Sequence, residues 1–246
     1  MKIATLNLRH NVDRWEGRFP LIVETLAHTD ADVIGLQEVW LEIQQAHLIA
    51  DALNQQSQSA TYEVYVVPKW GPQPVEGIAI LTRLPALEHA ILNLPGEGYR
   101  IAQWITIEVD GQALHIANTH LHHRPALDDS IRLPQMKQLL HWMFEHDSRH
   151  WLLTGDMNAL PESATIQAAL ESLQSAYLAT HGQHPVTFPT PLVETNIPDV
   201  CIDHILYDPQ TLQPTNAQVI GDHHHPEDTA LYPSDHYGLV AEFKMR

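Results

Sequence analysis

Carboxylate, amide and imidazole side chains stand at the ends of several strand-like runs in this sequence. Asn7 and Glu38 lie near the ends of two such runs, and His120 and Asp156 close two more. Oxygen ligands of this kind suit Mg²⁺ or Mn²⁺, which favour carboxylates, carbonyls and water. Because sheet proteins assemble their sites from loops at strand ends, this set predicts metal-assisted attack of water on a phosphorus ester.

Four more polar residues belong to the same pattern. Asn158 follows Asp156 in the stretch GDMN, and Asp235 and His236 directly precede the last strand-like run. Asp203 interrupts the otherwise apolar run CIDHILY, where an unpaired buried carboxylate would be costly. Each residue alone is also explained by a turn or a solvated strand end, so their joint placement carries the prediction of a site.

The elements that must position these residues alternate along the chain. Strand-like runs rich in Val, Ile, Thr and aromatic residues cover 2–9, 32–38, 61–68, 77–82, 101–109, 113–120, 151–156, 200–207 and 237–244. Helical patterns cover 18–27, 41–55, 130–146 and 162–173. This alternation predicts α/β layers, and the lack of repeats or linker-like composition predicts one domain over residues 1–246.

The alternation of side chains along a strand assigns two of these residues to faces. In the run 2–9, Asn7 shares its face with Ile3. In the run 32–38, the same period places Glu38 on the face of Ile34 and Leu36. We therefore expect a carboxylate to end an otherwise apolar row.

Charge and composition restrict the substrate. The chain has 246 residues, with 13 Lys and Arg against 30 Asp and Glu, and a formal net charge of −17. Such a surface repels polyanions, so we expect a small phosphoester or a phospholipid headgroup as substrate, with nucleic acid disfavoured. The single cysteine, Cys201, excludes an internal disulfide, and no apolar run is long enough for a leader or membrane span. These features predict a cytoplasmic protein.

Seven motifs carry a resemblance to a known family. They are TLNLR at 5–9, IGLQE at 34–38, GIAILTRLP at 77–85, NTHLHH at 118–123, LTGDMNALPES at 153–163, IDHILY at 202–207 and SDHYGLVAEF at 234–243. In this order and spacing, the chain resembles the endonuclease/exonuclease/phosphatase superfamily, which includes DNase I. The resemblance spans nearly the whole chain and implies a four-layer α/β sandwich, with two mixed β-sheets packed face to face and helices outside.

The resemblance also implies a metal site and a bound ion. Glu38 corresponds to the main metal-binding glutamate of the family, and Asn7 and Asp235 contribute directly or through water. The implied cofactor is Mg²⁺ or Mn²⁺, and the implied activity is hydrolysis of a phosphomonoester or phosphodiester.

Five positions take catalytic roles by the same resemblance. Asp156 and Asn158 would orient or activate the attacking water, and His120 would donate to phosphate oxygens. His236 would contact the phosphate or act as an acid or base, oriented by Asp203. Whether Asp156 or His236 removes the proton from water stays open at this point.

Two alternatives remain within the family, and both have a discriminating feature. The first is a nuclease acting on DNA or RNA. Arg9 stands where abasic-site endonucleases carry Asp, and the following W-x-x-R stretch is more similar to bacterial phosphodiesterase-like or phosphatase-like members. The second is a non-catalytic metal-binding relative, which would be expected to lack one of Glu38, Asp156 or His236.

A zinc hydrolase built on THLHHRP is excluded by the residues that follow the histidines. The pattern H-x-H-x-D-H requires Asp and His where this chain has Arg124 and Pro125. The histidines His223, His224 and His225, flanked by acidic residues and proline, predict a solvated loop.

Loops are expected to set specificity. The segments 69–76, 124–130, 181–199 and 208–232 are expected to form the cleft rim. Arg9, Arg124 and Arg132 are expected to offset substrate charge, and the six tryptophans to pack in the core and at the rim.

Overall fold

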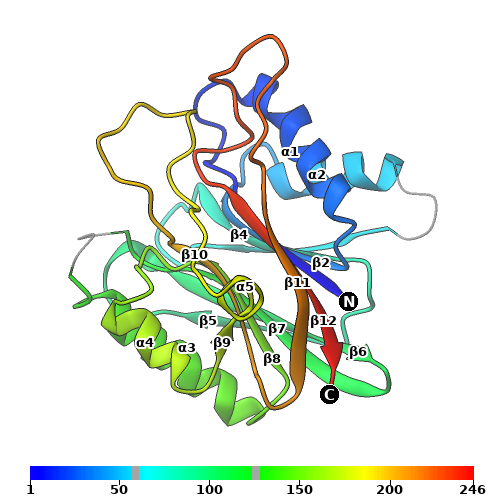
Figure 1. Cartoon of the computed structure of the whole chain (residues 1–246), viewed down its shortest axis with the longest axis vertical. Helices are drawn as coiled ribbons and strands as arrows, with labels where there is room; N and C mark the ends of the chain where they lie inside the picture. The colour runs from blue at the N-terminus through cyan, green and yellow to red at the C-terminus, as the bar shows by residue number, and fades with distance from the viewer. Residues whose placement is uncertain (57–60, 124–127) are drawn as a thin grey trace.

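Two six-stranded mixed sheets form the centre of the computed structural model, which describes residues 1–56, 61–123 and 128–246 (Figure 1). The first sheet has the order β11 (Leu212–Ile220), β12 (Gly238–Met245), β1 (Lys2–Asn7), β2 (Val33–Trp40), β4 (Glu76–Thr82) and β3 (Glu63–Pro68). The second has the order β5 (Glu88–Asn93), β6 (Ile101–Val109), β7 (Gln112–His120), β8 (Trp151–Asp156), β10 (Asp203–Tyr207) and β9 (Gln174–Ser175). Within them β1 pairs with β2, and β7 with β8, in parallel.

Helices cover the outer face of each sheet. These helices are α1 (Trp15–Thr29) and α2 (Gln45–Gln56) on the first sheet, and α3 (Arg132–His146) and α4 (Ala164–Leu170) on the second. The short helix α5 (Ala176–His181) packs against β10 and β11 and joins the core between the sheets, and the 3₁₀ turn η1 (Glu97–Tyr99) precedes β6. One apolar core joins α1 and α2 to the first sheet, a second joins α3 and α4 to the other, and a third fills the space between the sheets. The four-layer α/β sandwich implied by the resemblance is confirmed (Figure 1).

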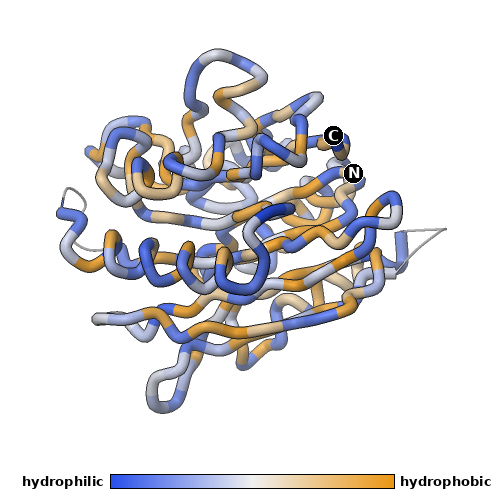
Figure 2. Tube along the Cα trace, turned by 90° about the horizontal axis from the view of Figure 1, so that it is seen from below, coloured by the Kyte–Doolittle hydropathy of each residue, from blue (hydrophilic) through white to orange (hydrophobic). Residues whose placement is uncertain are grey.

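Strand β1 shows why the sequence packs this way. Leu6 and Leu8 are buried against α1 and α2, whereas Ile3 is buried between the two sheets. Asn7, on the face of Ile3, therefore points toward the second sheet, as the period of two predicts. Figure 2 shows apolar stretches along the strands and hydrophilic stretches in the outer loops and turns.

The prediction for the face of Glu38 is wrong. A bulge interrupts the pairing of β2 with β4 between Leu36 and Val39, and Glu38 has a φ of 52°. The extra residue lets Val39 return to the helix-side core with Leu36, while Glu38 turns toward the second sheet, where it lies 3.9 Å from His120. The bulge thus takes the Glu38 carboxylate out of the apolar row and places it beside His120, at the end of β7.

Part of the rim prediction is also wrong. The segment 208–232 contains β11, an edge strand whose outer residues are partly exposed and which carries Pro214. Edge strand β5 was not predicted either, because its half-solvated residues form no apolar run.

Among the described residues, no helix has the length and apolar content needed to cross a membrane.

Candidate active site

The strand order places the predicted residues at one edge of the sandwich. Asn7, His120 and Asp156 are the last residues of β1, β7 and β8, and Asp203 is the first residue of β10. His120 and Asp203 stand directly opposite Asp156 in the ladders on its two sides. His236 comes just before β12, which runs antiparallel to β1 and so begins at the same edge.

Asp156 is the centre of the hydrogen-bond network. It is 1% exposed, and its Oδ2 accepts a bond of 2.9 Å from Asn7 Nδ2, which joins the two sheets. Its Oδ1 accepts a bond of 2.8 Å from the backbone N–H of Asn158, and Asn158 Nδ2 donates to the carbonyl of Leu121. Both carboxylate oxygens are therefore held in fixed positions.

His236 and Asp203 form a buried pair beside it. Nδ1 of His236 lies 2.9 Å from Asp203 Oδ2, so the ring presents Nε2 to Asp156 Oδ2 at 3.9 Å. The ring packs against Phe188, and its backbone N–H donates to Ser234 Oγ. The pair predicted from the motifs IDH and SDH is present in the fold.

Burial and like charges shift the protonation of this group. Burial, followed by the nearby Asp203 carboxylate, raises the pKa of Asp156 to about 7. Burial alone would lower the pKa of His236, but Asp203 and Asp156 outweigh it and raise that pKa to about 10. His236 therefore carries a proton at neutral pH, whereas Asp156 is poised to gain or lose one.

Glu38 reaches the same place from the first sheet. Its Oε1 lies 3.9 Å from His120 Nε2, and Asp156 Oδ2 lies 3.5 Å from the same nitrogen. Burial, followed by the positive charges of Arg100 and Lys69, holds the pKa of His120 well below its usual range. His120 is thus a neutral imidazole between two carboxylates.

The donor set fits a hard divalent cation. Ligand atoms of Asp156, Asp203 and His236 lie within 4.8 Å of one another, and Asp203 Oδ1 is buried with no hydrogen-bond partner among the described residues. Burial makes the charge of Asp156 costly, and the Asp203 carboxylate beside it adds an excess of negative charge. Carboxylate oxygens are the ligands that Mg²⁺ and Mn²⁺ prefer, so an added cation would relieve this excess.

The three residues predicted to hold the metal are not in mutual contact. Arg9 connects two of them, because its backbone N–H donates to Asn7 Oδ1 and its guanidinium pairs with Asp235. Glu38 stands apart from these two, beside His120 and His10. Asn7 and Glu38 both face the Asp156 side of the site, whereas the Asp235 carboxylate is paired with Arg9.

A chain of polar contacts, which the sequence did not predict, leads to Glu38. His10 Nε2 lies 3.2 Å from Glu38 Oε2 and also contacts the Glu76 carboxylate, which in turn pairs with Lys69. The backbone fixes His10, since its N–H donates to the carbonyl of Glu38 and its own carbonyl accepts from Gln45. Lys69 and Glu76 lie in the predicted rim segment 69–76, but no spacing pointed to His10.

Arg18, which was not predicted to contact substrate, has a structural role. Arg18 is buried and donates to the carbonyls of Leu8, Val12 and Pro233, which ties the segment after β1 to the loop before His236. Burial lowers its pKa to about 10.

Arg132 was expected to offset substrate charge, but its buried guanidinium donates to the carbonyls of His122 and Asp128. Arg124, which was expected to do the same, lies outside the described residues, as does Pro125. Arg100, which the sequence did not single out, is 4% exposed, and its charge acts on Asp156 and Glu38.

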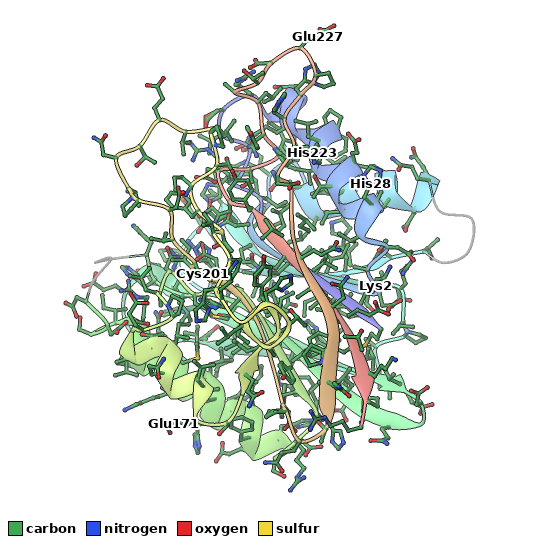
Figure 3. All side chains as sticks on the ribbon, in the orientation of Figure 1. Lys2, His28, Glu171, Cys201, His223 and Glu227 are labelled. Atoms are coloured by element: carbon green, nitrogen blue, oxygen red, sulfur yellow. The ribbon has the colours of Figure 1, made fainter. Side chains whose placement is uncertain are left out.

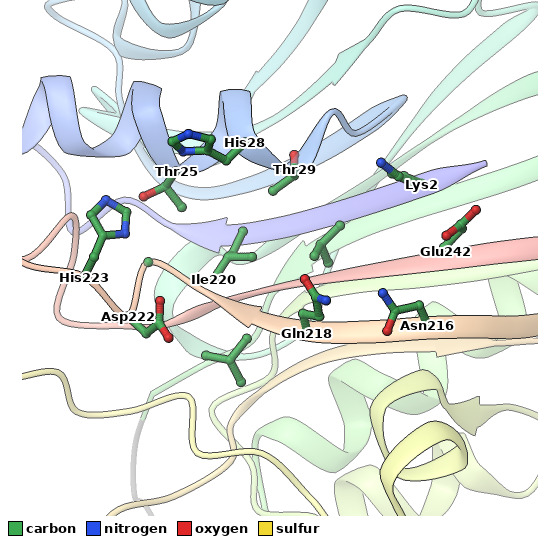
Figure 4. A pocket seen from close by; sticks show the side chains of 13 residues that line it. Lys2, Thr25, His28, Thr29, Asn216, Gln218, Ile220, Asp222, His223 and Glu242 are labelled. Carbon is green, nitrogen blue, oxygen red and sulfur yellow. The ribbon is translucent and has the colours of Figure 1, made fainter.

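Two other features lie apart from this edge. A hollow between α1 and β11 is lined by polar residues that include Lys2, His28 and Glu242 (Figure 4). None of the described residues that line it is a predicted site residue. His223 borders this hollow at the base of an outer loop that also carries Glu227 (Figure 3), and His224 is exposed, as a solvated loop predicts.

Comparisons with known proteins agree with this architecture. The model of the Endonuclease/Exonuclease/phosphatase family matches residues 4–236. No curated protein is detectably similar to the chain in sequence.

Solved structures share the fold at low identity. The human Nocturnin catalytic domain with bound sulfate superposes with a TM-score of 0.79 at 23% identity, covering 100% of this chain and 94% of that one. A mannosyl-6-phosphatase from Bacteroides thetaiotaomicron gives 0.78 at 21% identity, with 99% of each chain covered. TDP2 from D. rerio, complexed with a single-strand DNA product, gives 0.76 at 20% identity and covers 99% of this chain and 98% of that one.

Proposed function

The chain belongs to the endonuclease/exonuclease/phosphatase family, whose members hydrolyse phosphoesters, and we propose that it is a Mg²⁺- or Mn²⁺-dependent hydrolase of small phosphomonoesters or phosphodiesters. The proposal treats residues 1–246 as one catalytic domain. The observation that carries it is the buried arrangement in which the Asp203–His236 pair and His120 flank Asp156.

Glu38 is the proposed principal metal ligand, with Asn7 and Asp235 acting through water or after Arg9 moves from Asp235. A bound divalent ion would neutralise charge on the phosphoryl oxygens and lower the pKa of a nearby water. The chain of contacts from Lys69 through Glu76 and His10 would keep the Glu38 carboxylate in place.

Asp156 is the proposed acceptor of the water proton, and His236 and His120 are the proposed donors to the phosphoryl oxygens. Asp156, held at both oxygens by Asn7 and Asn158, accepts the proton of the attacking water at Oδ2. His236 has its Nδ1 engaged by Asp203, so its Nε2–H is free to donate to a phosphoryl oxygen. His120 donates to the same group. Of the two candidates for the base, Asp156 and His236, we therefore propose Asp156.

Charge favours a small substrate. With 13 Lys and Arg against 30 Asp and Glu, the chain has few cations with which to follow a polynucleotide backbone. The relatives of similar fold include a mannosyl-6-phosphatase and a DNA-processing TDP2, so the fold itself accommodates both kinds of substrate. The net charge of −17 supports the small ester, which includes a phospholipid headgroup.

The test is a comparison of second-order rate constants in one buffer with Mg²⁺ or Mn²⁺. The substrates are aryl phosphates, sugar phosphates, phospholipid headgroup esters, plasmid DNA and single-strand DNA. We expect small esters to be hydrolysed faster than DNA, and the gap to widen at low salt because repulsion is then less screened.

Two results would contradict the proposal. DNA cleavage at low salt that equals or exceeds the small-ester rate would make the chain a nuclease. Tight metal binding without turnover of any ester would make it a non-catalytic relative.

A further inference from the structure

Two exposed aromatic side chains meet beside the candidate active site. Trp70, between β3 and β4, and Tyr99, at the end of η1, are 45% and 44% exposed. Their rings lie 4.7 Å apart at an interplanar angle of 85°, so they form a corner with one ring face and one ring edge, called here the aromatic corner. Of the six tryptophans, all in the described part of the chain, Trp70 is the exposed one.

The chain ties this corner to the reacting groups. Trp70 directly follows Lys69, whose ammonium pairs with Glu76 in the contacts that lead to Glu38. Tyr99 directly precedes Arg100, whose charge acts on Asp156 and Glu38. Each aromatic residue is thus the sequence neighbour of a cationic residue that contacts or acts on the site.

Backbone packs closely against one ring of the corner. The backbone of Gly71 lies against the ring of Tyr99, since a Cβ at Gly71 would come within 2.6 Å of that ring. Gly98 lies as closely against the ring of His122, at 2.6 Å for the same hypothetical atom. Large aromatic surfaces that are exposed but fixed lose little entropy when a ligand packs on them.

The Arg100 guanidinium has donors that an anionic group of a ligand could use. It is 4% exposed, and its Nη2 lies 3.2 Å from His123 Nδ1, but none of the residues that the structure describes hydrogen-bonds its Nε or Nη1. Buried donors without acceptors are costly, and guanidinium groups are well suited to phosphoryl oxygens. Tyr99, one of the two rings of the aromatic corner, directly precedes the arginine that carries these donors.

We propose that the aromatic corner binds a ring in the alcohol part of the substrate while Arg100 holds an oxygen of the phosphoryl group. The substrate class is then a phosphoester of a ring-bearing alcohol, with a sugar or a nucleoside as the two sources of such a ring. This inference rests on the proposed phosphoesterase function and names the substrate side of it.

The test compares ring-bearing with acyclic esters across variants. The ring-bearing esters are p-nitrophenyl phosphate, a hexose phosphate and a nucleoside monophosphate, and the acyclic ester is glycerol phosphate. Bis(p-nitrophenyl) phosphate and glycerophosphocholine form the equivalent pair of diesters. The variants are Trp70→Ala, Tyr99→Ala and Trp70→Phe. The control is Leu87→Ala, which also removes a large, exposed apolar side chain; Leu87 directly precedes β5 and is 60% exposed.

The readout is the ratio of kcat/KM for a ring-bearing ester to that for the acyclic ester. We expect Trp70→Ala and Tyr99→Ala to lower this ratio at least about fivefold, mainly through KM, because stacking on an aromatic side chain contributes that much. Trp70→Phe should recover most of the ratio, and Leu87→Ala should keep the wild-type value. Comparison of the hexose and nucleoside esters identifies the source of the ring.

A wild-type ratio in both alanine variants would overturn the inference. Weaker binding to phosphatidylcholine vesicles with an unchanged ratio would also overturn it, and would make the corner a lipid-docking surface. Failure of the proposed function is seen separately, as absence of turnover by the wild-type protein. Melting temperatures check that each variant is folded.

Discussion

The Asp203–His236 pair gives the sharpest prediction, through the variant Asp203→Asn. The substitution keeps the shape of the side chain and removes its charge. Asp203 Oδ2 lies 2.9 Å from His236 Nδ1, and both residues are buried. Asn can still accept this hydrogen bond through its amide oxygen, so the change isolates the electrostatic part of the contact.

The structure sets the size of the effect. The pKa of His236 is raised from 6.5 to about 10 although burial acts in the opposite direction, and Asp203 is the largest of the groups that raise it. A rise of this size corresponds to about 5 kcal/mol in favour of the protonated ring. Loss of the Asp203 charge should remove at least about half of it, which lowers the pKa by about 2 units.

The consequences follow from the role of a protonated His236. In wild type the ring keeps its proton through neutral pH. In Asp203→Asn the lowered pKa of His236 falls within the usual assay range. As the pH rises, the activity of the variant should therefore begin to decline at a lower pH than that of wild type. A pKa lowered to about 8 leaves the ring mostly protonated at pH 7, so we expect kcat to fall chiefly above pH 8, by about tenfold relative to wild type at pH 9.

Two measurements check this, with a matched control. NMR titration of the EDTA-treated protein reports the pKa of His236 directly, and the pH profile of kcat with saturating Mg²⁺ reports its effect on turnover. The control is Asp147→Asn, which removes the carboxylate 3.3 Å from the buried His115 Nε2, in a partly exposed pair away from the site. If Asp203→Asn leaves both the His236 titration and the pH profile as in wild type, the reasoning about this pair is refuted.

Three more predictions concern the metal ligand and the stability of the fold. Glu38→Gln should lower kcat by at least about 100-fold in EDTA-treated, Mg²⁺-restored enzyme, and near-wild-type turnover would exclude Glu38 as the principal ligand. Burial lowers the pKa of His204 to about 4, so its neutral form contributes up to about 3 kcal/mol of stability that is present above pH 6.5 and lost as the pH falls to 4. Urea unfolding of His204→Gln should therefore show a flatter dependence on pH over that range, and an unchanged slope would contradict the assignment. Arg18→Met should lower the free energy of unfolding by about 3 kcal/mol or more because it leaves buried carbonyls unpaired, whereas Arg14→Met, at an exposed pair with Asp228, should cost less than about 1 kcal/mol in the same urea titration.

Strands buried on both faces were the elements that the sequence predicted best. The bounds of β6 and β8 agree with the predicted runs 101–109 and 151–156, because a strand between two packed layers must be apolar along its whole length. Strands β5 and β11 lie at the edges of their sheets, where half of each strand meets water. Their composition resembles that of a loop, and neither was predicted.

The sequence indicated which polar residues meet at this edge of the sandwich, but not how their side chains are directed. Asn7, His120 and Asp156 end strands, and strand ends can be read from the point where an apolar run stops. The bulge at Glu38 leaves no mark in a period of two, and it reverses the direction of the side chain. His10 gave no signal at all, because its role depends on a left-handed backbone and on contacts with Glu38 and Glu76.

The apposition of Asp156 and Asp203 explains why local sequence could not reveal the electrostatics. The two carboxylates stand directly opposite each other in the antiparallel ladder of β8 and β10, an arrangement that is destabilising for like charges. Register between strands distant in sequence decides this pairing, and no property of either strand alone encodes it. A fold that buries two facing carboxylates keeps an excess of negative charge, which His236 offsets only in part, as the raised pKa of Asp156 indicates. The same excess that lowers the stability of the ladder is what makes this edge of the sandwich suited to a divalent cation.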